Sequence, residues 1–200
     1  MRSANPGWEV TVLSTEYACA KLPCLRDKSV QFQSDMARLC ALYEFGGVWL
    51  DASCICNNSV EEWVDIESNC LQGFSAPWSD ENHPVLENWA FATPRQFSFM
   101  AEWKSEVHKA CVMGAQPYCD DLSDSTISSA LRPHLPYLVC HAAFMVVKQQ
   151  RGADCVRMRK SHLIGGPFHY VDRVNWEATA AVKSLASAQD TRLYLSLIHI

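Results

Sequence analysis

The sequence lacks several features that would place it in a specialised class of protein. It has no run of basic residues and carries a net charge of −5, which disfavours nucleic acid as a partner. No apolar run is long enough to span a bilayer. Without internal repeats or low-complexity linkers, nothing divides the 200 residues into two domains. The composition, 48% apolar and 20% charged, is that of one globular domain with a sizeable core.

Cys-x-x-Cys pairs are also missing, although the chain has ten cysteines, and this absence argues against a zinc ribbon. Cys40 and Cys140 lie in apolar, helix-like stretches and are expected to be buried thiols. Two other pairs flank loops and suit disulfides in an oxidising compartment, Cys19 with Cys24 and Cys111 with Cys119. We favour buried free thiols, because the expected core is sufficient without cross-links.

Strands alternate with helices along the chain, which predicts an α/β fold. Strands are expected at residues 9–13, 48–50, 71–76, 88–92 and 155–158. Helices are expected at residues 34–44, 97–113, 120–131, 138–149 and 171–188, with Ser34 as the N-cap of the first and Asp120, Asp121 and Asp124 capping the third. The remaining assignments are a turn at 5–7, an irregular segment at 16–29 and a helical turn at 60–63.

Residues 34–53 are the most informative segment. Asp35 and Arg38 are three residues apart and therefore share one face of the predicted helix. Gly46 and Gly47 end that helix and allow a tight reversal. Three apolar residues then place Asp51 at the carboxyl end of a short strand, where open α/β sheets bind their ligands. This arrangement suits a nucleotide-sugar site.

The pattern Ser-Asp-x-x-Arg-x-x-x-Leu-Tyr-x-x-Gly-Gly-Val-Trp-Leu-Asp resembles the core motif of glycosyltransferases with a DxD-type sugar-binding region, and is most similar to their capsular polysaccharide synthesis branch. Weaker similarity at residues 5–10 and 88–103 extends the resemblance over about residues 5–150. The resemblance implies a glycosyltransferase-A-type fold, with a mixed central sheet flanked by helices, and a nucleotide-diphosphate-sugar donor. The last six residues match a translated sequencing-library adapter, and only one candidate strand precedes the motif, so we expect one catalytic domain over residues 1–194, truncated at both ends, followed by an adapter-derived tail at 195–200.

The resemblance also assigns roles to residues of the motif. Asp35 and Arg38 would contact the donor sugar beside Gly46 and Gly47, and Asp51 would bind the ribose or a divalent cation, manganese or magnesium. A carboxylate accepts hydrogen bonds from sugar hydroxyls, and a guanidinium binds hydroxyl or phosphate oxygens in a fork. Ser53 stands where the family usually has a second acid, and a hydroxyl is a poorer ligand for a hard cation. Whether Ser53 binds the metal or only shapes the loop is open.

Other polar residues have both a functional and a structural interpretation. His162 and His169 flank a Gly-Gly-Pro turn and would contact phosphate or metal if that loop closes over the donor, although surface histidines are commoner. A loop cluster would offer a general base or simply be solvated: Asp80, Glu81 and His83. His134 and His141 fit structural roles. No residue stands out as a catalytic nucleophile.

Together these patterns predict a glycosyltransferase that moves a sugar from a nucleotide donor to a glycan or other hydroxyl acceptor. Two alternatives stay open. The loss of the second acid suits a binding relic without catalysis, and Asp51 paired with Asp80 or Glu81 would suit a glycoside hydrolase. The expected location is the Golgi lumen in a eukaryote, with the membrane anchor outside this chain, or the cytoplasm in a bacterium.

Overall fold

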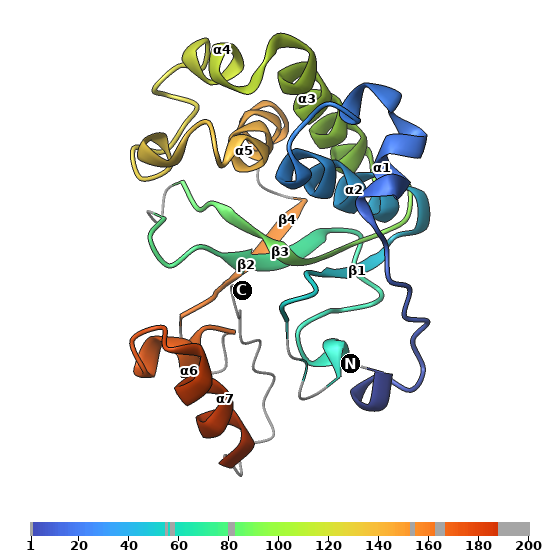
Figure 1. Ribbon diagram of the computed structural model, residues 1–200, viewed down its shortest axis with the longest axis vertical. Coiled ribbons are helices and arrows are strands. Elements are labelled where there is room, and N and C mark those ends of the chain that lie inside the picture. The colour runs from blue at the N-terminus through green and yellow to red at the C-terminus, as the bar shows by residue number, and fades with distance from the viewer. Residues whose placement is uncertain are drawn as a thin grey trace.

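The computed structural model describes residues 2–54, 56, 59–79, 83–152, 155–162 and 167–187, with the backbone alone at 169, 170, 178 and 185–187. A four-stranded sheet lies between a thick layer of helices and a thinner layer on its other face (Figure 1).

The strands are β1 (Gly47–Leu50), β2 (Leu71–Ser75), β3 (Leu86–Thr93) and β4 (Val156–Lys160). The thick layer contains α1 (Thr15–Lys21), α2 (Val30–Phe45), α3 (Ser98–Met113), α4 (Ala115–Asp120) and α5 (Val139–Arg151). The thin layer contains α6 (His169–Arg173) and α7 (Ala178–Ser187). Short 3-10 turns are η1 (Arg2–Ala4), η2 (Pro23–Leu25), η3 (Val60–Glu62) and η4 (Arg132–His134).

The strand order β1-β3-β2-β4 makes the sheet mixed. Strand β3 is antiparallel to both of its neighbours, whereas β2 and β4 are parallel. Strands β1, β2 and β4 therefore run in the same direction, and their carboxyl ends meet the amino end of β3 at one edge. The predicted α/β class, with a mixed sheet flanked by helices, is confirmed.

Helix α2 carries the motif and begins earlier than predicted. The hydroxyl of Ser29 accepts a hydrogen bond from the backbone N–H of Phe32, which caps the helix before the expected position at Ser34. The prediction of Ser34 as the N-cap is wrong, because Ser29 offers the same chemistry more than one turn earlier. Gly46 ends the helix as predicted, with a φ of 70°.

Gly46 is required where α2 turns into β1. A Cβ atom on Gly46 would lie 2.6 Å from the backbone nitrogen of Arg95, and φ is in the left-handed region. Gly47 has a φ of 88°, but a Cβ atom there would meet no other atom within 4 Å, so it offers a matched control. We expect Gly46→Ala to lower the free energy of unfolding by about 3 kcal/mol and Gly47→Ala by about 1 kcal/mol in urea titrations. Equal losses would show that the contact with Arg95 does not matter.

Two hydrophobic cores hold the layers together. The larger lies between the sheet and helices α1–α5 and contains a cluster of aromatic rings, Phe91, Phe99, Trp103 and Phe144. The smaller lies on the other face and contains a second cluster, Trp63, Phe74, Trp89 and Phe168. The sheet is thus covered on both faces, so that only its edges and strand ends remain for a ligand.

Several local predictions are wrong. The expected strand at 9–13 is extended chain without a strand partner among the described residues, and Val12 is 86% exposed. The segment 16–29, expected to be irregular, contains α1 and η2. Turns replace the expected helix at 120–131, so the capping role of its aspartates is wrong too; Asp120 ends α4, and Asp124 pairs with Arg132 at 2.6 Å. The final helix is divided into α6 and α7.

The cysteines agree with the preferred interpretation. All ten are free thiols, including the two pairs considered for disulfides. Cys40 and Cys140 are buried, as expected. In the described part of the chain, no helix is both long and apolar enough to cross a membrane.

Candidate functional site

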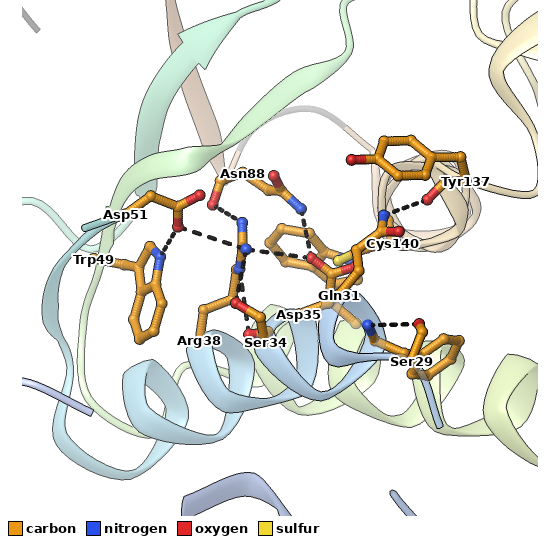
Figure 2. Close-up of polar contacts among 12 residues, drawn as sticks. Ser29, Gln31, Ser34, Asp35, Arg38, Trp49, Asp51, Asn88, Tyr137 and Cys140 are labelled. Carbon is orange, nitrogen blue, oxygen red and sulfur yellow. Dashed lines mark hydrogen bonds and ion pairs between the residues drawn. The ribbon is translucent and has the colours of Figure 1, made fainter. Parts of the chain in front are cut away.

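Arg38 is the centre of a buried polar cluster beneath the end of β1 (Figure 2). Its guanidinium donates to the main-chain carbonyl of Asn88 at 2.6 Å. It also pairs with two carboxylates, Asp35 at 3.4 Å and Asp51 at 3.5 Å. The ring of Trp49 lies 5.6 Å from its central carbon, within cation–π range. The structure thus brings together three of the residues that the motif predicts for the site.

Asn88 and Asp35 form the inner part of this cluster. The Asn88 amide donates to Asp35 Oδ1 at 3.1 Å, and Asp35 is only 3% exposed. Burial is the main reason that the pKa of Asp35 rises to about 6; Arg38 and the Asn88 hydrogen bond oppose the shift, and the nearby Asp51 charge adds to it. Because this pKa is still below 7, Asp35 is mostly ionised at neutral pH. The two carboxylates, Asp35 and Asp51, then outnumber the single guanidinium of Arg38.

A bulge in β3 places Asn88 in this cluster. From the pair Gly73–Phe91 to the pair Ser75–Leu86, β2 advances by two residues and β3 by five. The three extra residues lie directly opposite the end of β1, where the N–H of Asp51 donates to the carbonyl of Trp89 at 2.8 Å. Bulges of this kind re-aim side chains beside functional sites. Here the bulge turns Asn88 towards α2.

Asp51 is the member of the cluster that reaches the surface. Its side chain is 29% exposed, compared with 6% for Arg38 and 5% for Asp35. Trp49 Nε1 donates to Asp51 Oδ1 at 2.7 Å and fixes the orientation of the carboxylate. The excess negative charge is therefore presented at the carboxyl edge of the sheet. It favours a bound cation or the hydroxyl groups of a sugar over a bare phosphate.

Glu87 is a second buried carboxyl group, and it lies in the bulge; its sequence context did not single it out as a site residue. It accepts a hydrogen bond from Trp89 Nε1 at 2.8 Å. Burial raises the pKa of Glu87 to about 7, and the bond from Trp89 opposes this shift only partly.

This shift predicts how stability depends on pH. The folded protein holds the Glu87 proton more tightly than the unfolded chain does, where the ordinary pKa is 4.5. The contribution of Glu87 to the free energy of unfolding therefore falls as the pH rises from about 4.5 to about 7, and it is constant above that range. Glu87→Gln removes the titrating proton. We expect the variant to be more stable than the wild type by about 2–3 kcal/mol at pH 8 and equally stable at pH 4 in urea titrations. An equal difference at both pH values would contradict the prediction.

Gly46 and Gly47 lie apart from Asp51, at the opposite end of β1. Four residues of strand separate the two ends by about 13 Å. The glycines line a different hollow of about 360 Å³, together with Trp8, Ile66 and other residues. Their observed role is to shape the turn from α2 into β1, and their predicted contact with the donor stays a prediction.

Among the residues considered for a metal whose side chains the structure describes, His162 lies apart from Asp51 and Ser53. Ser53 lies in the turn after Asp51, which the bond from Cys54 N–H to the Asp51 carbonyl closes at 2.9 Å. His162 follows β4 and is exposed; β4 is three strand spacings from β1, or about 14 Å. His169 begins α6, and only its backbone is described. Within the described ranges, no group of three His, Cys, Asp or Glu side chains is arranged to hold an ion.

Parts of the two predicted loop sites lie outside the residues that the structure describes. Asp80 and Glu81 are among residues 80–82, and the Gly-Gly turn between the two histidines is among residues 163–166. His83 is described and has interaction partners.

Comparison with known proteins bears on the segment that carries this cluster. Residues 26–117 match the family model of the capsular polysaccharide synthesis proteins. The match includes α2, β1, β2, β3 and α3, and it is narrower than the resemblance over residues 5–150 that the sequence suggested. No curated protein and no solved structure matches the chain. The family match supports the similarity to capsular polysaccharide synthesis proteins and a role in polysaccharide biosynthesis.

Asn88 is the member of the cluster that sequence reasoning missed. A signal was present, because Glu87 and Asn88 form a polar pair within an otherwise apolar strand from Val85 to Ala92. Polar residues at positions that should be buried often mark functional or strained sites. The pair marks the bulge in this case.

Proposed function

We propose that the chain is a glycosyltransferase that moves a sugar from a nucleotide-diphosphate donor to a hydroxyl acceptor of a growing glycan. The observation that carries the proposal is Asp51, a partly exposed carboxylate held by Arg38 and Trp49 at the carboxyl edge of a mixed α/β sheet. This edge is where open α/β sheets bind nucleotides and related ligands. The family match to capsular polysaccharide synthesis proteins supports the same chemistry.

In this proposal, Asp51 is the residue that contacts the donor or its cation directly. Its carboxylate accepts hydrogen bonds from sugar or ribose hydroxyls, or binds a cation. Arg38 and Asp35, whose side chains are buried, hold Asp51 in place and set its charge. Arg38 or Asp35 would touch the donor sugar directly only if the residues that cover its side chain moved aside.

A manganese or magnesium ion fits this site only with help from the donor. Asp51 supplies a carboxylate and Ser53 a hydroxyl two residues later, and magnesium sites are commonly completed by substrate phosphates. When bound, such an ion would neutralise the charge that develops on the leaving diphosphate. The excess negative charge around Asp51 is consistent with a cation there.

The test is release of nucleoside diphosphate from a panel of donors. We would incubate the protein with UDP-glucose, UDP-galactose, UDP-N-acetylglucosamine and GDP-mannose, each with a mixture of oligosaccharide acceptors and with manganese, magnesium or EDTA, and measure free UDP or GDP. We expect release from at least one donor, and more with a cation than with EDTA. A folded protein that releases nothing from any donor contradicts the proposal.

A catalytically silent binding protein is the second candidate, because a hydroxyl at Ser53 replaces an acid. It would bind UDP or GDP without releasing either from a donor. A glycoside hydrolase would instead cleave nitrophenyl glycosides in the absence of any nucleotide. Nucleotide release, nucleotide binding and cleavage of nitrophenyl glycosides, measured side by side, therefore separate the three candidates.

A further inference from the structure

Two cysteines that are far apart in the sequence meet on one face of helix α3. Cys24 lies in the turn η2, and its Sγ atom is 3.7 Å from Nε2 of His108. Cys111 is three residues after His108 on α3, so both side chains lie on the face of the helix that Cys24 contacts. The thiols of Cys24 and Cys111 are also in hydrogen-bond contact with each other. The structure therefore brings together two thiols and an imidazole.

The two thiols differ in their access to solvent. Cys24 is exposed, whereas Cys111 is only 2% exposed and belongs to the larger core. A reagent in solution can therefore reach Cys24 first. Cys111 needs no access of its own, because the sulfur that it would attack is the neighbouring one of Cys24.

The surroundings of Cys111 suit a thiol that reacts second. Burial raises the pKa of the Cys111 thiol, the adjacent Cys24 adds to the shift, and Lys28 opposes it. A thiol reacts as its thiolate, so Cys111 is inert towards reagents in solution. Once the sulfur of Cys24 is bound in a disulfide it carries no charge, and its part of the shift disappears when Cys111 has to react.

His108 supplies a base for the first step. Its ring is half-buried, and Nε2 faces the sulfur of Cys24, so the imidazole can accept the proton of the thiol. Imidazole is the side chain that most often takes up protons in catalysis, and an adjacent base is a common way to activate a cysteine. The exposed cysteine is thus the one with a base beside it.

We propose that Cys24 and Cys111 are a thiol-modification site, at which a low-molecular-weight disulfide oxidises the pair to an internal disulfide. Cys24 loses its proton to His108 and attacks one sulfur of the external disulfide, which forms a mixed disulfide and releases one thiol. The Cys111 thiolate then attacks the sulfur of Cys24 and displaces the second thiol. Two protein thiols are oxidised, and one external disulfide is reduced to two thiols. This site goes beyond the proposed function and does not depend on it.

The new bond would close a loop that contains the candidate site. Helix α2 and strands β1, β2 and β3 all lie between Cys24 and Cys111. Disulfides that close long loops restrict the unfolded chain most strongly. The turn η2 is already held against α2, because Gln33 Nε2 donates to the carbonyls of Leu25 and Lys28 at 3.1 and 3.0 Å. We therefore expect oxidation to stabilise the fold.

The test is oxidation of the full chain in glutathione redox buffers, followed by tandem mass spectrometry of the unreduced peptides. We expect the number of free thiols to fall by two from the original ten, and the new bond to join Cys24 with Cys111. The midpoint of urea unfolding should rise by about 1 M or more. Cys24→Ser should prevent the bond and leave Cys111 unmodified. The control variant Cys70→Ser removes a partly exposed thiol just before β2 and should leave the result unchanged.

His108→Gln tests the base separately. Glutamine is polar but does not take up a proton, so the same disulfide should form at least about 10-fold more slowly. An unchanged rate would contradict the role of His108. Ten free thiols after oxidation, a mixed disulfide that persists on Cys24, or a bond between other cysteines such as Cys19 and Cys24 would overturn the proposal, whatever the donor assay shows.

Discussion

Replacing Arg38 with methionine is expected to destabilise the protein by about 3–5 kcal/mol, the loss typical when one partner of a buried ion pair is removed. Methionine fills similar space but leaves the Asp35 carboxylate with only the Asn88 amide, and it removes the donor to the Asn88 carbonyl. Because an unpaired Asp35 takes up a proton more readily, the loss should be larger at pH 8 than at pH 5. Urea titrations at the two pH values measure both effects.

Two further variants make this prediction specific. Asp35→Asn in the Arg38→Met background removes the stranded charge and should recover about 1–3 kcal/mol, a coupling typical of residues in one network. Arg157→Met removes an exposed arginine 3.9 Å from Asp65 and should change stability by less than about 1 kcal/mol. The account of the cluster fails if Arg38→Met behaves like Arg157→Met, or if Asp35→Asn gives no recovery.

Replacing Asp51 with asparagine is expected to lower the rate of nucleotide release at least 100-fold while leaving the fold intact. Asparagine keeps an oxygen to accept the bond from Trp49, and Arg38 retains Asp35 as a partner. The charge that binds a cation or sugar hydroxyls is lost, and bonds to charged groups contribute about 1.5–3 kcal/mol or more. Initial rates with the most reactive donor of the panel measure the effect.

Asp124→Asn is the matched control for Asp51. Asp124 also pairs with an arginine, Arg132, but it is 98% exposed and lies in the loop after α4. The control should release nucleotide at the wild-type rate. If Asp51→Asn and Asp124→Asn have the same rate, Asp51 is not part of the reacting site.

The motif residues were predictable because local rules and tertiary structure agree in this segment. The spacing of Asp35 and Arg38 required only a helix, and Gly46 ended it where a left-handed residue was needed. The strand that follows delivers Asp51 to the sheet edge as predicted. Burial of the first two residues was not predictable, because it depends on Asn88, which is distant in sequence and reaches the cluster through a bulge in β3.

The local failures also have physical causes. Helix α1 has no side-chain cap and is held by tertiary contacts, with Tyr17 and Lys21 both bound to Glu44. In the expected helix at 120–131, the hydroxyl of Ser128 accepts a hydrogen bond from the backbone N–H of Ala130 at 3.2 Å, and such local bonds to the backbone compete with helix formation.

The last predicted helix breaks for a different reason. Asn175 and Trp176 adopt positive φ angles of 49° and 63°, which no α-helix allows. Trp176 also packs on Phe168, with ring centroids 5.0 Å apart, so a contact between rings eight residues apart stabilises the break. Periodicity along the sequence does not contain this information.

The most direct test of the central claim is calorimetric titration of UDP and GDP into the wild type and Asp51→Asn, with and without manganese. If Asp51 lies at the core of a nucleotide-sugar site, one nucleotide binds the wild type, manganese strengthens the binding, and Asp51→Asn loses most of it. Binding of equal strength in the two proteins would place the nucleotide elsewhere. Absence of binding to the folded wild type, under all four conditions, would contradict the assignment of a nucleotide-sugar site to this edge of the sheet.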